Sequence, residues 1–511
     1  MEQSIGALLT HSARKFGGKT ALVVDGTEWS FRQLDNLSSA IANGLRKRGV
    51  SRGSVVSLYS PNCVQWVVSY YAVLKLGAVV NPLNLMLTPA EAAYAVNDCK
   101  AVAVLGSLDK VAPLREALGN AGARLISFGD AAEAGECLDD LLSEGSEGFV
   151  PVDDIRAGDM STIGYTSGTT GHPKGAMLSH GAILMNTAMT AMFHVRTERD
   201  TVVSALPCSH VYGNIVMNSA IACGMTLVLH AVFDARSILS SIETYKATLF
   251  EGVPTMYMYL LNSPELGDYD ISSITRCTVG GQTMPPHKMK EVESRFNAPL
   301  LELWGMTELG GLGTTHSFYG PRKHGSIGVP LTFCDARIGS LERPCVELKV
   351  GEIGELQMKG PITMIGYFGR PEATAETIEA DGWLHTGDLA YKDEEGFIFV
   401  VDRLKDMVIT GGFNVYPAEL ERVLCEHPAV AMAAVVGVPD ETKGELAKAF
   451  VVQRNGIALD PENVLQFCRE RLAAYKVPRL IEVVDDLPKT SSGKVLRREL
   501  RARSLTGNTV S

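Results

Sequence analysis

The chain has 511 residues, too many for a single hydrophobic core, so we expect two or more domains. Hydrophobic residues make up 46% of it, charged residues 21% and aromatic residues 7%, which is typical of a globular protein and excludes a disordered or fibrous one. The net charge of -11 argues against a general nucleic-acid-binding protein, which needs a basic face, but allows small anionic ligands.

The ten cysteines are scattered and form no Cys-x-x-Cys pair, a pattern that favours free thiols over a disulfide framework or a zinc site. The N-terminal residues mix charged and apolar side chains and contain no apolar segment typical of a signal peptide. The apolar run at 67–80 is interrupted by Lys75 and Gly77 and is too short to cross a bilayer. We therefore expect a cytoplasmic protein without an integral membrane segment.

In chain order, the first predicted element is a helix that begins after Ser30. Ser30 and Gln33 have the spacing of a capping box, and Leu34, Ile41 and Leu45 follow at helical spacing. Short apolar runs then alternate with helical stretches, which is typical of an α/β domain with a largely parallel sheet. The runs lie at 55–58, 101–105 and 125–128, and the helical stretches at 63–76 and 89–97. The segment 131–149 is expected to be at most an exposed connection.

A stretch rich in hydroxyls and glycines, Y-T-S-G-T-T-G-H-P-K-G-A-M-L-S-H, occupies residues 165–180 and surrounds Lys174. Glycines let backbone N–H groups approach an anion, hydroxyls add donors and the lysine supplies charge, so the stretch predicts a phosphate-binding loop just before an apolar run that could open a helix. It lacks the spacing of a Walker A loop, and composition alone would also suit a polar surface turn. The expected phosphate-binding residues are Thr166, Ser167, Gly168, Thr169, Thr170, Gly171 and Lys174.

This stretch resembles the signature loop of the adenylate-forming superfamily, which includes acyl-CoA synthetases, luciferases and the adenylation domains of peptide synthetases. The resemblance extends over nearly the whole chain and implies that the loop holds the β- and γ-phosphates of ATP. It also implies a large N-terminal α/β domain of several subdomains at 1–402, a hinge at 403–406 and a small mobile C-terminal α+β domain at 407–511.

Further motifs assign the rest of the nucleotide through the same resemblance. In W-G-M-T-E at 304–308, the aromatic ring would stack on adenine, Thr307 would contact the α-phosphate, and Glu308 would hold Mg²⁺ together with Thr166. Outside this context, a lone glutamate is usually a solvated surface charge. The expected ATP- or AMP-binding residues beyond the loop are Gly280, Gly281, Gln282, Trp304, Gly305, Met306, Asp388 and Arg403.

The resemblance implies that Asp388 binds the ribose of ATP. A carboxylate can accept hydrogen bonds from both ribose hydroxyls, and Arg403 would pair with it. Lys405 occupies the hinge position, where a few residues absorb a large backbone rotation. After that rotation, Gly411 and Gly412 would line the tunnel for the pantetheine arm of coenzyme A.

His210, in L-P-C-S-H-V-Y-G, would gate the acyl pocket and lie beside the reacting carboxylate, although a lone histidine is more often structural. Three glycines, Gly310, Gly311 and Gly313, follow Glu308 where the family lines this pocket. We expect them to leave room for an aromatic or medium-to-long acyl group in preference to acetate. The expected acyl-binding residues are His210, Tyr212, Gly281, Gly305, Gly311 and Leu312.

From Met407 onward, the pattern predicts a compact α+β module. A helix is expected at 418–425, strands at 430–438 and 449–452, and a further helix opened by Asp460 and Pro461. The last motif, P-K-T-S-S-G-K, ends in Lys494. The resemblance makes this lysine catalytic, alongside His210, Thr307 and Glu308.

The implied reaction has two halves. A carboxylate attacks the α-phosphorus of MgATP, which releases pyrophosphate and leaves an acyl-adenylate, and the thiol of coenzyme A then takes the acyl group and releases AMP. Because the first half brings two anions together, catalysis depends on positioning and charge neutralisation. The partners are thus a small carboxylic acid, ATP and coenzyme A, and a homodimer is left open.

Several alternatives share these motifs. A stand-alone adenylation enzyme would load the acyl group onto a carrier protein, but the chain ends at Ser511 soon after the last motif, which favours coenzyme A. A luciferase-like oxygenase is a weaker match. A non-catalytic ATP-binding homologue would show gaps in the motif set, and the set has none.

Replacing Lys494 with alanine is expected to cripple adenylate formation, because the cation that would bridge the carboxylate and the α-phosphate is lost. Thioester formation from a supplied acyl-adenylate should remain largely intact, because that step needs the lysine out of the way. The two rates are measured separately, as pyrophosphate release and as consumption of acyl-adenylate by coenzyme A. Equal loss of both half-reactions would contradict the assignment.

Overall fold

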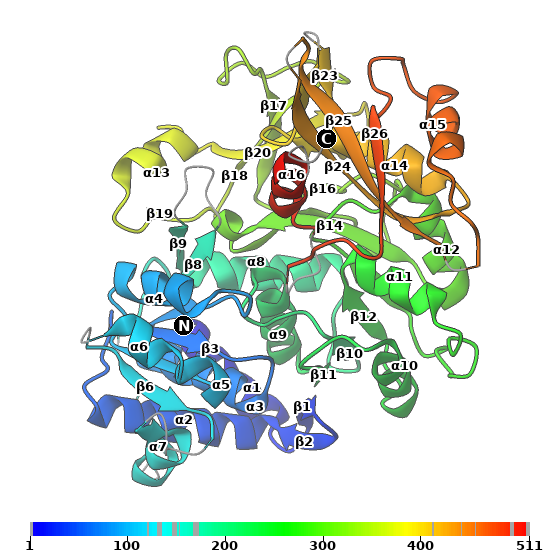
Figure 1. Cartoon of the computed structure of the whole chain (residues 1–511). Helices are drawn as coiled ribbons and strands as arrows, with labels where there is room; N and C mark the ends of the chain where they lie inside the picture. Colours follow the sequence, from blue (N-terminus) through cyan, green and yellow to red (C-terminus); the bar gives the residue numbers. More distant parts are fainter. Residues whose placement is uncertain are drawn as a thin grey trace.

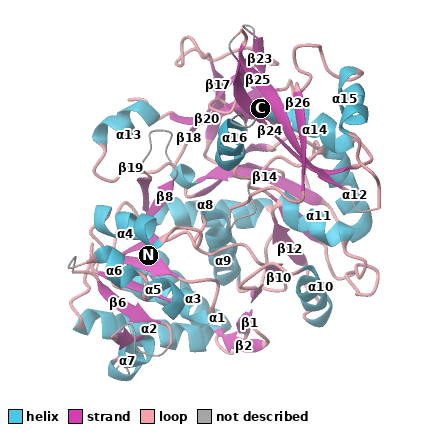
Figure 2. Ribbon diagram, in the orientation of Figure 1, coloured by secondary structure: helices cyan, strands magenta, loops and turns pink. Residues whose placement is uncertain are grey.

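The computed structural model of the chain describes residues 4–119, 122–129, 135–145, 151–152, 154–166, 173–410, 413–440, 442–454, 456–490 and 495–506. Within these ranges the strands form four sheets, flanked by helices (Figures 1 and 2). The predicted fold class is confirmed, with a large N-terminal α/β part and a small C-terminal α+β part, which lies at the top of the molecule in Figure 1.

The largest sheet has the order β16-β15-β14-β13-β12-β10-β11-β1-β2 among the described residues. Its strands from β14 to β1 pair in parallel, whereas β2, β15 and β16 are antiparallel to their neighbours. The bounds are β1 (Thr20–Val24), β2 (Thr27–Ser30), β10 (Thr201–Ser204), β11 (Thr226–Leu229), β12 (Leu249–Gly252), β13 (Arg276–Val279), β14 (Leu300–Met306), β15 (Gly311–Thr315) and β16 (Val329–Pro330).

A second sheet has the order β19-β9-β8-β4-β3-β5-β6-β7 and is parallel from β8 to β7. At the end of the sheet next to β8, strands β9 and β19 run antiparallel to their neighbours. The bounds are β3 (Val55–Tyr59), β4 (Val79–Pro82), β5 (Ala103–Gly106), β6 (Arg124–Ser127), β7 (Glu136–Cys137), β8 (Met160–Thr166), β9 (Lys174–Ser179) and β19 (Gly366–Tyr367).

The other two sheets are smaller. One is antiparallel in the order β17-β18-β20-β21, and the other, in the C-terminal part, has the order β23-β22-β25-β24 with β26 parallel to β25. The bounds are β17 (Asp335–Gly339), β18 (Gly354–Lys359), β20 (Leu384–Lys392), β21 (Ile398–Arg403), β22 (Val408–Thr410), β23 (Phe413–Val415), β24 (Val430–Asp440), β25 (Gly444–Gln453) and β26 (Leu480–Val484).

Helices α1, α3, α8 and α9 pack against one another and contact strands of the two large sheets, and Figure 2 shows α8 and α9 between them. On α3, Trp66, Tyr70 and Tyr71 are all buried. Large apolar side chains suit this helix because it is enclosed by neighbouring elements. The helices are α1 (Ile5–Phe16), α2 (Phe31–Lys47), α3 (Val64–Lys75), α4 (Pro89–Asp98), α5 (Leu108–Val111), α6 (Leu114–Leu118), α7 (Leu138–Glu144), α8 (His180–Phe193), α9 (Val211–Cys223), α10 (Ala235–Thr244), α11 (Pro254–Asn262), α12 (Pro286–Phe296), η1 (Thr307–Leu309), α13 (Pro371–Thr377), α14 (Pro417–Glu426), α15 (Pro461–Arg469) and α16 (Arg497–Thr506).

The C-terminal part has hydrophobic clusters of its own on the two faces of its sheet. Val435 and Ala449 belong to one cluster, and their neighbours in sequence, Val436 and Phe450, belong to the other. Successive residues of a strand point to opposite faces, so this sheet is covered on both sides. The predicted helix opened by Asp460 is confirmed as α15, in which the Asp460 side chain accepts a hydrogen bond from the backbone N–H of Glu462.

The predicted helix after Ser30 is also confirmed as α2, with both hydrogen bonds of the capping box present. Two expectations were wrong. The segment 131–149 is not merely an exposed connection, because within its described part α7 buries Leu138 and Leu141, and Leu141 packs against Gly44 of α2. The apolar run after Lys174 is strand β9, paired with β8, and the helix begins only after Ser179, which caps α8.

Among the described residues, no helix combines the length and the apolar character needed to cross a lipid bilayer.

A buried ion pair supports the largest sheet next to the helices between the sheets. Arg196 and Glu251 are almost fully buried, and the guanidinium lies 2.9 Å and 3.0 Å from the two carboxylate oxygens. Arg196→Met is expected to lower the free energy of unfolding by about 3 to 5 kcal/mol, because it leaves the Glu251 charge buried without its partner. Urea unfolding measures this loss. The double replacement Arg196→Met with Glu251→Met should recover much of it, and a double variant less stable than the single one would contradict the explanation.

Candidate functional site

The candidate site lies where β14 changes its pairing partner. The first part of β14 pairs in parallel with β13, up to Glu302, and its second part, from Leu303, pairs antiparallel with β15. In open α/β sheets, ligands bind beyond the carboxyl ends of the strands. Trp304 and Glu308 both follow this change of partner, so the motif W-G-M-T-E lies at the carboxyl end of the sheet.

The predicted phosphate and metal residues that the structure describes come together at this point. Glu308 lies in η1 and is buried, with 6% of its surface exposed. Its Oε1 lies 3.4 Å from the Thr166 hydroxyl at the end of β8. Lys174 begins β9, directly across the β8–β9 ladder from Thr166. A carboxylate, a hydroxyl and an ammonium group from three segments thus meet, and together they can hold a polyphosphate and a hard cation.

Thr307 precedes Glu308 and is partly buried. A side-chain carbon added to Gly164 of β8 would lie 2.7 Å from the Thr307 methyl group, so glycine at this position lets η1 approach the second sheet closely. The two large sheets therefore meet at the site through η1 and β8.

Tyr367 of β19 is a site residue that the motif analysis missed. Its hydroxyl donates a hydrogen bond of 2.8 Å to Glu308 Oε1, and its ring centroid lies 5.3 Å from Lys174 Nζ. Burial, and then the charge of Glu308, raises the pKa of Tyr367, so the phenol keeps its proton and remains a donor. Tyr367 is 59 residues from Glu308 along the chain, and only the register of β19 on β9 brings it to the site.

The predicted ribose site is assembled from three strands. Trp304 Nε1 donates a hydrogen bond of 2.7 Å to Asp388 Oδ2, and Arg403 Nε lies 2.9 Å from Asp388 Oδ1. Asp388 and Arg403 are direct partners in the β20–β21 ladder, and Asp388 is buried with 3% of its surface exposed. Trp304 and Arg403 therefore fix the orientation of a buried carboxylate beside β14.

The predicted adenine segment follows β13. Gly281 has a φ of 88°, which only glycine adopts without strain, and Gln282 comes directly after it. A side-chain carbon on Gly280 would lie 2.2 Å from Leu303 Cδ1, so this glycine allows the segment to pack on β14. The structure thus places Gly280, Gly281 and Gln282 beside the strand that carries Trp304, Gly305 and Met306.

Gly311 and Gly313 do not provide the space that we expected in the acyl site. A side-chain carbon on Gly311 would lie 2.5 Å from Ile215 Cγ1, and one on Gly313 would lie 2.7 Å from the Trp304 ring. These glycines therefore permit close packing and do not open space. At Gly310 the nearest described atom to such a carbon, Leu178 Cδ2, would be 3.7 Å away, an ordinary contact, but the φ of this glycine is 62°.

The remaining predicted acyl residues lie near the start of α9 and on β15. His210 is the N-cap of α9, and its Nδ1 accepts a hydrogen bond of 3.3 Å from the backbone N–H of Tyr212. The Tyr212 side chain is buried, and its hydroxyl is 2.7 Å from the Thr278 hydroxyl. Leu312 is buried opposite Gly305 in the β14–β15 ladder. Their roles toward an acyl group stay predictions.

Lys405 is exposed in the turn that follows β21. On one side of this turn, Asp402 accepts hydrogen bonds from the backbone N–H of Arg403 and of Ala418, and burial raises its pKa to about 6. On the other side, Arg497 of α16 pairs with Asp406 at 3.5 Å. The turn is thus anchored at both ends.

Several predicted residues lie outside the described residues. They are Ser167, Gly168, Thr169, Thr170 and Gly171 of the phosphate loop, Gly411 and Gly412 of the pantetheine tunnel, and the catalytic candidate Lys494.

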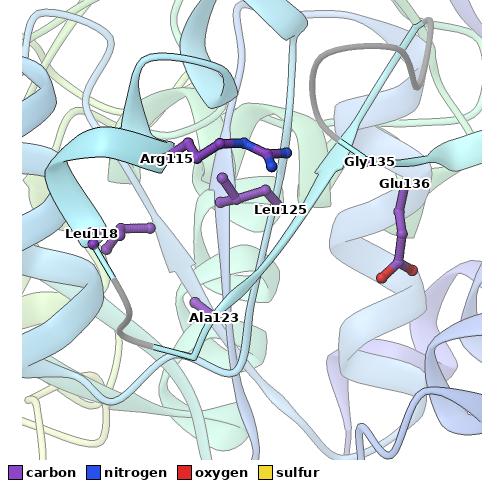
Figure 3. A pocket seen from close by; sticks show the side chains of 7 residues that line it. Arg115, Leu118, Ala123, Leu125, Gly135 and Glu136 are labelled. Carbon is purple, nitrogen blue, oxygen red and sulfur yellow. The ribbon is translucent and has the colours of Figure 1, made fainter.

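One pocket at the surface of the described residues lies elsewhere. It has a volume of about 320 Å³ and lies between α6 and strands β6 and β7, where Arg115, Leu125 and Glu136 line it (Figure 3). None of its lining residues belongs to the site at the end of β14.

A family comparison shows which proteins share the sequence that carries these predicted phosphate and ribose residues. The sequence model of the AMP-binding enzyme family matches residues 9–368, and that of the AMP-binding enzyme C-terminal domain matches residues 419–494. The chain belongs to the AMP-binding enzyme family.

Characterised members of this family are similar to the chain over almost its whole length. It is 37% identical to a long-chain-fatty-acid–CoA ligase of Bacillus subtilis (strain 168), with 98% of this chain and 94% of the relative covered. It is 38% identical to a feruloyl-CoA synthase of Amycolatopsis sp, with 98% and 99% covered. The chain is accordingly an AMP-forming acyl-CoA ligase, which activates a carboxylic acid with ATP and transfers the acyl group to coenzyme A.

A solved structure also matches this ligase. The ATP-bound structure of MatB from Rhodopseudomonas palustris has a TM-score of 0.91 at 32% identity, with 98% of this chain and 99% of that chain covered. The apo structure of the same protein covers equal shares but has a TM-score of 0.78. Since sequence and coverage are the same, the difference lies in conformation, and the ligase has the arrangement of the ATP-bound form.

Contacts between the two parts of the ligase maintain this arrangement. Lys489 Nζ, from the C-terminal part, lies 3.1 Å from the hydroxyl of Tyr259 on α11 and 2.5 Å from Asp486. Arg498 of α16 is near enough to α4 to lower the pKa of Glu91, although the hydrogen bonds from Thr88 lower it more. The C-terminal part therefore lies over the N-terminal part from α4 to α11.

Trp304→Phe in this ligase is expected to weaken ATP binding about tenfold, because the ring remains but the charge-assisted hydrogen bond to Asp388 is lost. Isothermal titration calorimetry with ATP measures the change. Trp383→Phe is the matched control, since Trp383 packs on Arg337 in the neighbouring sheet and touches neither Asp388 nor β14 in the contacts described. Equal weakening by both replacements would contradict the role of the Trp304 indole.

Proposed function

We propose that this ligase activates a fatty or aromatic carboxylic acid in preference to acetate, with Mg²⁺ as the metal ion bound with ATP. The MgATP part of the proposal rests on the pair of buried carboxylates at the end of β14, Glu308 beside Thr166 and Lys174, and Asp388 beside Trp304 and Arg403. The first group suits a metal-bound polyphosphate, and the second suits a ribose diol.

The donors at Glu308 fit Mg²⁺. Among the described residues, Oε1 has two protein neighbours, the hydroxyls of Thr166 and Tyr367, whereas Oε2 has no hydrogen-bond partner. No cluster of three or more acidic, histidine or cysteine side chains suited to a metal occurs in the described part of the chain. Mg²⁺ is commonly held by one or two carboxylates together with substrate phosphates, and so needs no such cluster. When bound, the ion would neutralise charge on the phosphates as pyrophosphate leaves.

Different residues of the chain would then contact different parts of ATP and of the acid. Lys174 and the loop 166–171 would hold the β- and γ-phosphates, and Thr307 would contact the α-phosphate. Asp388, with Arg403, would orient the ribose, while the segment 280–282 and Trp304 would hold adenine. His210 would lie beside the carboxylate of the acid, and Lys494 would bridge that carboxylate and the α-phosphate.

The two half-reactions would use different arrangements of residues 1–402 and 407–511, with rotation at the hinge 403–406. The similarity to ATP-bound MatB supports the first arrangement for the conformation described here. Rotation about Lys405 would remove Lys494 and bring Gly411 and Gly412 to the site, where the pantetheine arm must enter.

The substrate class rests on the relatives, because the glycines at 310–313 no longer support it. One relative is named for long-chain fatty acids and another for a feruloyl group, which is aromatic. Both are coenzyme A ligases, which favours coenzyme A over a carrier protein as the acyl acceptor.

A panel of acids tests the proposal through pyrophosphate release with MgATP. Acetate, octanoate, palmitate, benzoate and ferulate are compared at equal concentration, and the best fatty or aromatic acid should exceed acetate in kcat/KM by at least about tenfold, because each methylene buried in an apolar pocket adds to discrimination. Addition of EDTA should abolish the release, and Mg²⁺ should restore it. Acetate as the best substrate would contradict the substrate class, and activity that survives EDTA would contradict the metal role.

A further inference from the structure

Strand β19 attaches a distant segment to the two halves of the phosphate site. In the ladder with β9, Gly366 pairs with Met177 and Tyr367 with Ala176. Backbone hydrogen bonds of 2.8 Å continue this contact on both sides, from the N–H of Ile365 to Met177 and from the N–H of Phe368 to Gly175. The position of Tyr367 is therefore determined by the backbone and not by its own side chain.

The same segment is tied to η1. The backbone N–H of Met364 donates a hydrogen bond of 2.8 Å to the carbonyl of Glu308. The segment therefore contacts the backbone of the metal-binding candidate at Met364 and its side chain at Tyr367.

The register also explains the contact with Lys174. Tyr367 lies opposite Ala176, and Lys174 is two residues from Ala176 in β9, so the two side chains are diagonal neighbours on one face of the sheet. The ammonium lies 5.3 Å from the ring centroid, within the range of a cation–π interaction.

Helix α4 makes a second set of contacts with the segment that carries Tyr367. Asp98 of α4 accepts hydrogen bonds from Tyr165 at 2.6 Å and from Arg370 at 2.9 Å. Tyr165 immediately precedes Thr166, and Arg370 follows Tyr367 by three residues. Asp98 thus joins the beginning of the phosphate loop to the segment that carries Tyr367.

We propose that Tyr367 is a positioning residue for both partners of the polyphosphate, with its hydroxyl orienting the Glu308 carboxylate toward the metal ion and its ring holding the Lys174 ammonium toward the phosphates. The hydroxyl donates to Oε1, whereas Oε2 has no hydrogen-bond partner among the described residues. Hydrogen bonds to a metal-binding carboxylate restrict its orientation, and their loss commonly weakens metal binding 10- to 100-fold. The inference rests on the proposed metal role of Glu308.

Two replacements separate the two contacts. Tyr367→Phe keeps the ring and removes the hydroxyl, so it should raise the apparent KM for Mg²⁺ about tenfold while the affinity for metal-free ATP stays within about twofold. Tyr367→Leu removes both contacts, so it should weaken metal-free ATP binding as well, by about threefold or more. ATP binding in EDTA is measured by calorimetry.

Metal binding is measured directly with Mn²⁺ as the probe, by electron paramagnetic resonance of the full-length enzyme saturated with α,β-methylene-ATP. Tyr367→Phe should show about tenfold weaker Mn²⁺ binding than the unmodified enzyme. Tyr59→Phe is the matched control, since it also removes the hydrogen bond of a tyrosine in the same sheet, here to the carbonyl of Leu87, but not one to Glu308 or to the segment that carries Tyr367. It should leave the Mn²⁺ affinity unchanged.

The outcomes distinguish this inference from the proposed function. If Glu308→Gln weakens Mn²⁺ binding but Tyr367→Phe does not, the role of Tyr367 is refuted and the metal role of Glu308 stands. If Glu308→Gln has no effect, the metal role itself is refuted. Equal weakening by Tyr59→Phe and Tyr367→Phe would refute a specific contact with Glu308. Metal-free ATP affinity that is the same in Tyr367→Leu and Tyr367→Phe would refute the contact with Lys174.

Discussion

The structure depends on holding two carboxylates in place although they are nearly removed from water. Glu308 and Asp388 are 6% and 3% exposed, and a buried carboxylate is costly unless donors or cations hold it. Glu308 is held by hydroxyls from β8 and β19, and Asp388 by the indole of Trp304 and the guanidinium of Arg403. Each carboxylate therefore requires contributions from a different sheet. This requirement explains why three sheets meet at the end of β14.

Strand β14 lies next to both carboxylates, because it pairs in parallel with β13 in its first half and antiparallel with β15 in its second half. Its parallel half continues the core of the largest sheet, and its antiparallel half turns away with β15. Trp304 and Glu308 lie on either side of a short glycine-containing segment, close enough for one nucleotide to reach both. The C-terminal part lies over this point from α4 to α11, in the arrangement of the ATP-bound relative. The exposed turn at Lys405 lies where the C-terminal part is attached.

Contiguous motifs were predictable, because residues close in sequence stay close in space whatever the fold. The capping box at Ser30, the α/β alternation and the order of strands and helices follow from local propensity and periodicity. The glycines at 310–313 show where such inference fails, since a glycine marks either open space or close packing, and only Ile215 and Trp304, which come from other elements, decide between them. The apolar run after Lys174 fails similarly, because three or four apolar residues suit a strand or a helix until a partner such as β8 is known.

What the sequence by itself determined is the family and the fold class, and it also predicted most of the groups proposed to bind ATP, because these are carried by residue types at short fixed spacings. What only the tertiary structure decided is which groups share a partner. Tyr367 lies in a short Gly-Tyr pair that carries no signal of its own, and it reaches Glu308 and Lys174 only through the register of β19 on β9. Register depends on backbone hydrogen bonds between segments far apart in the chain, and such bonds leave no local pattern in the sequence.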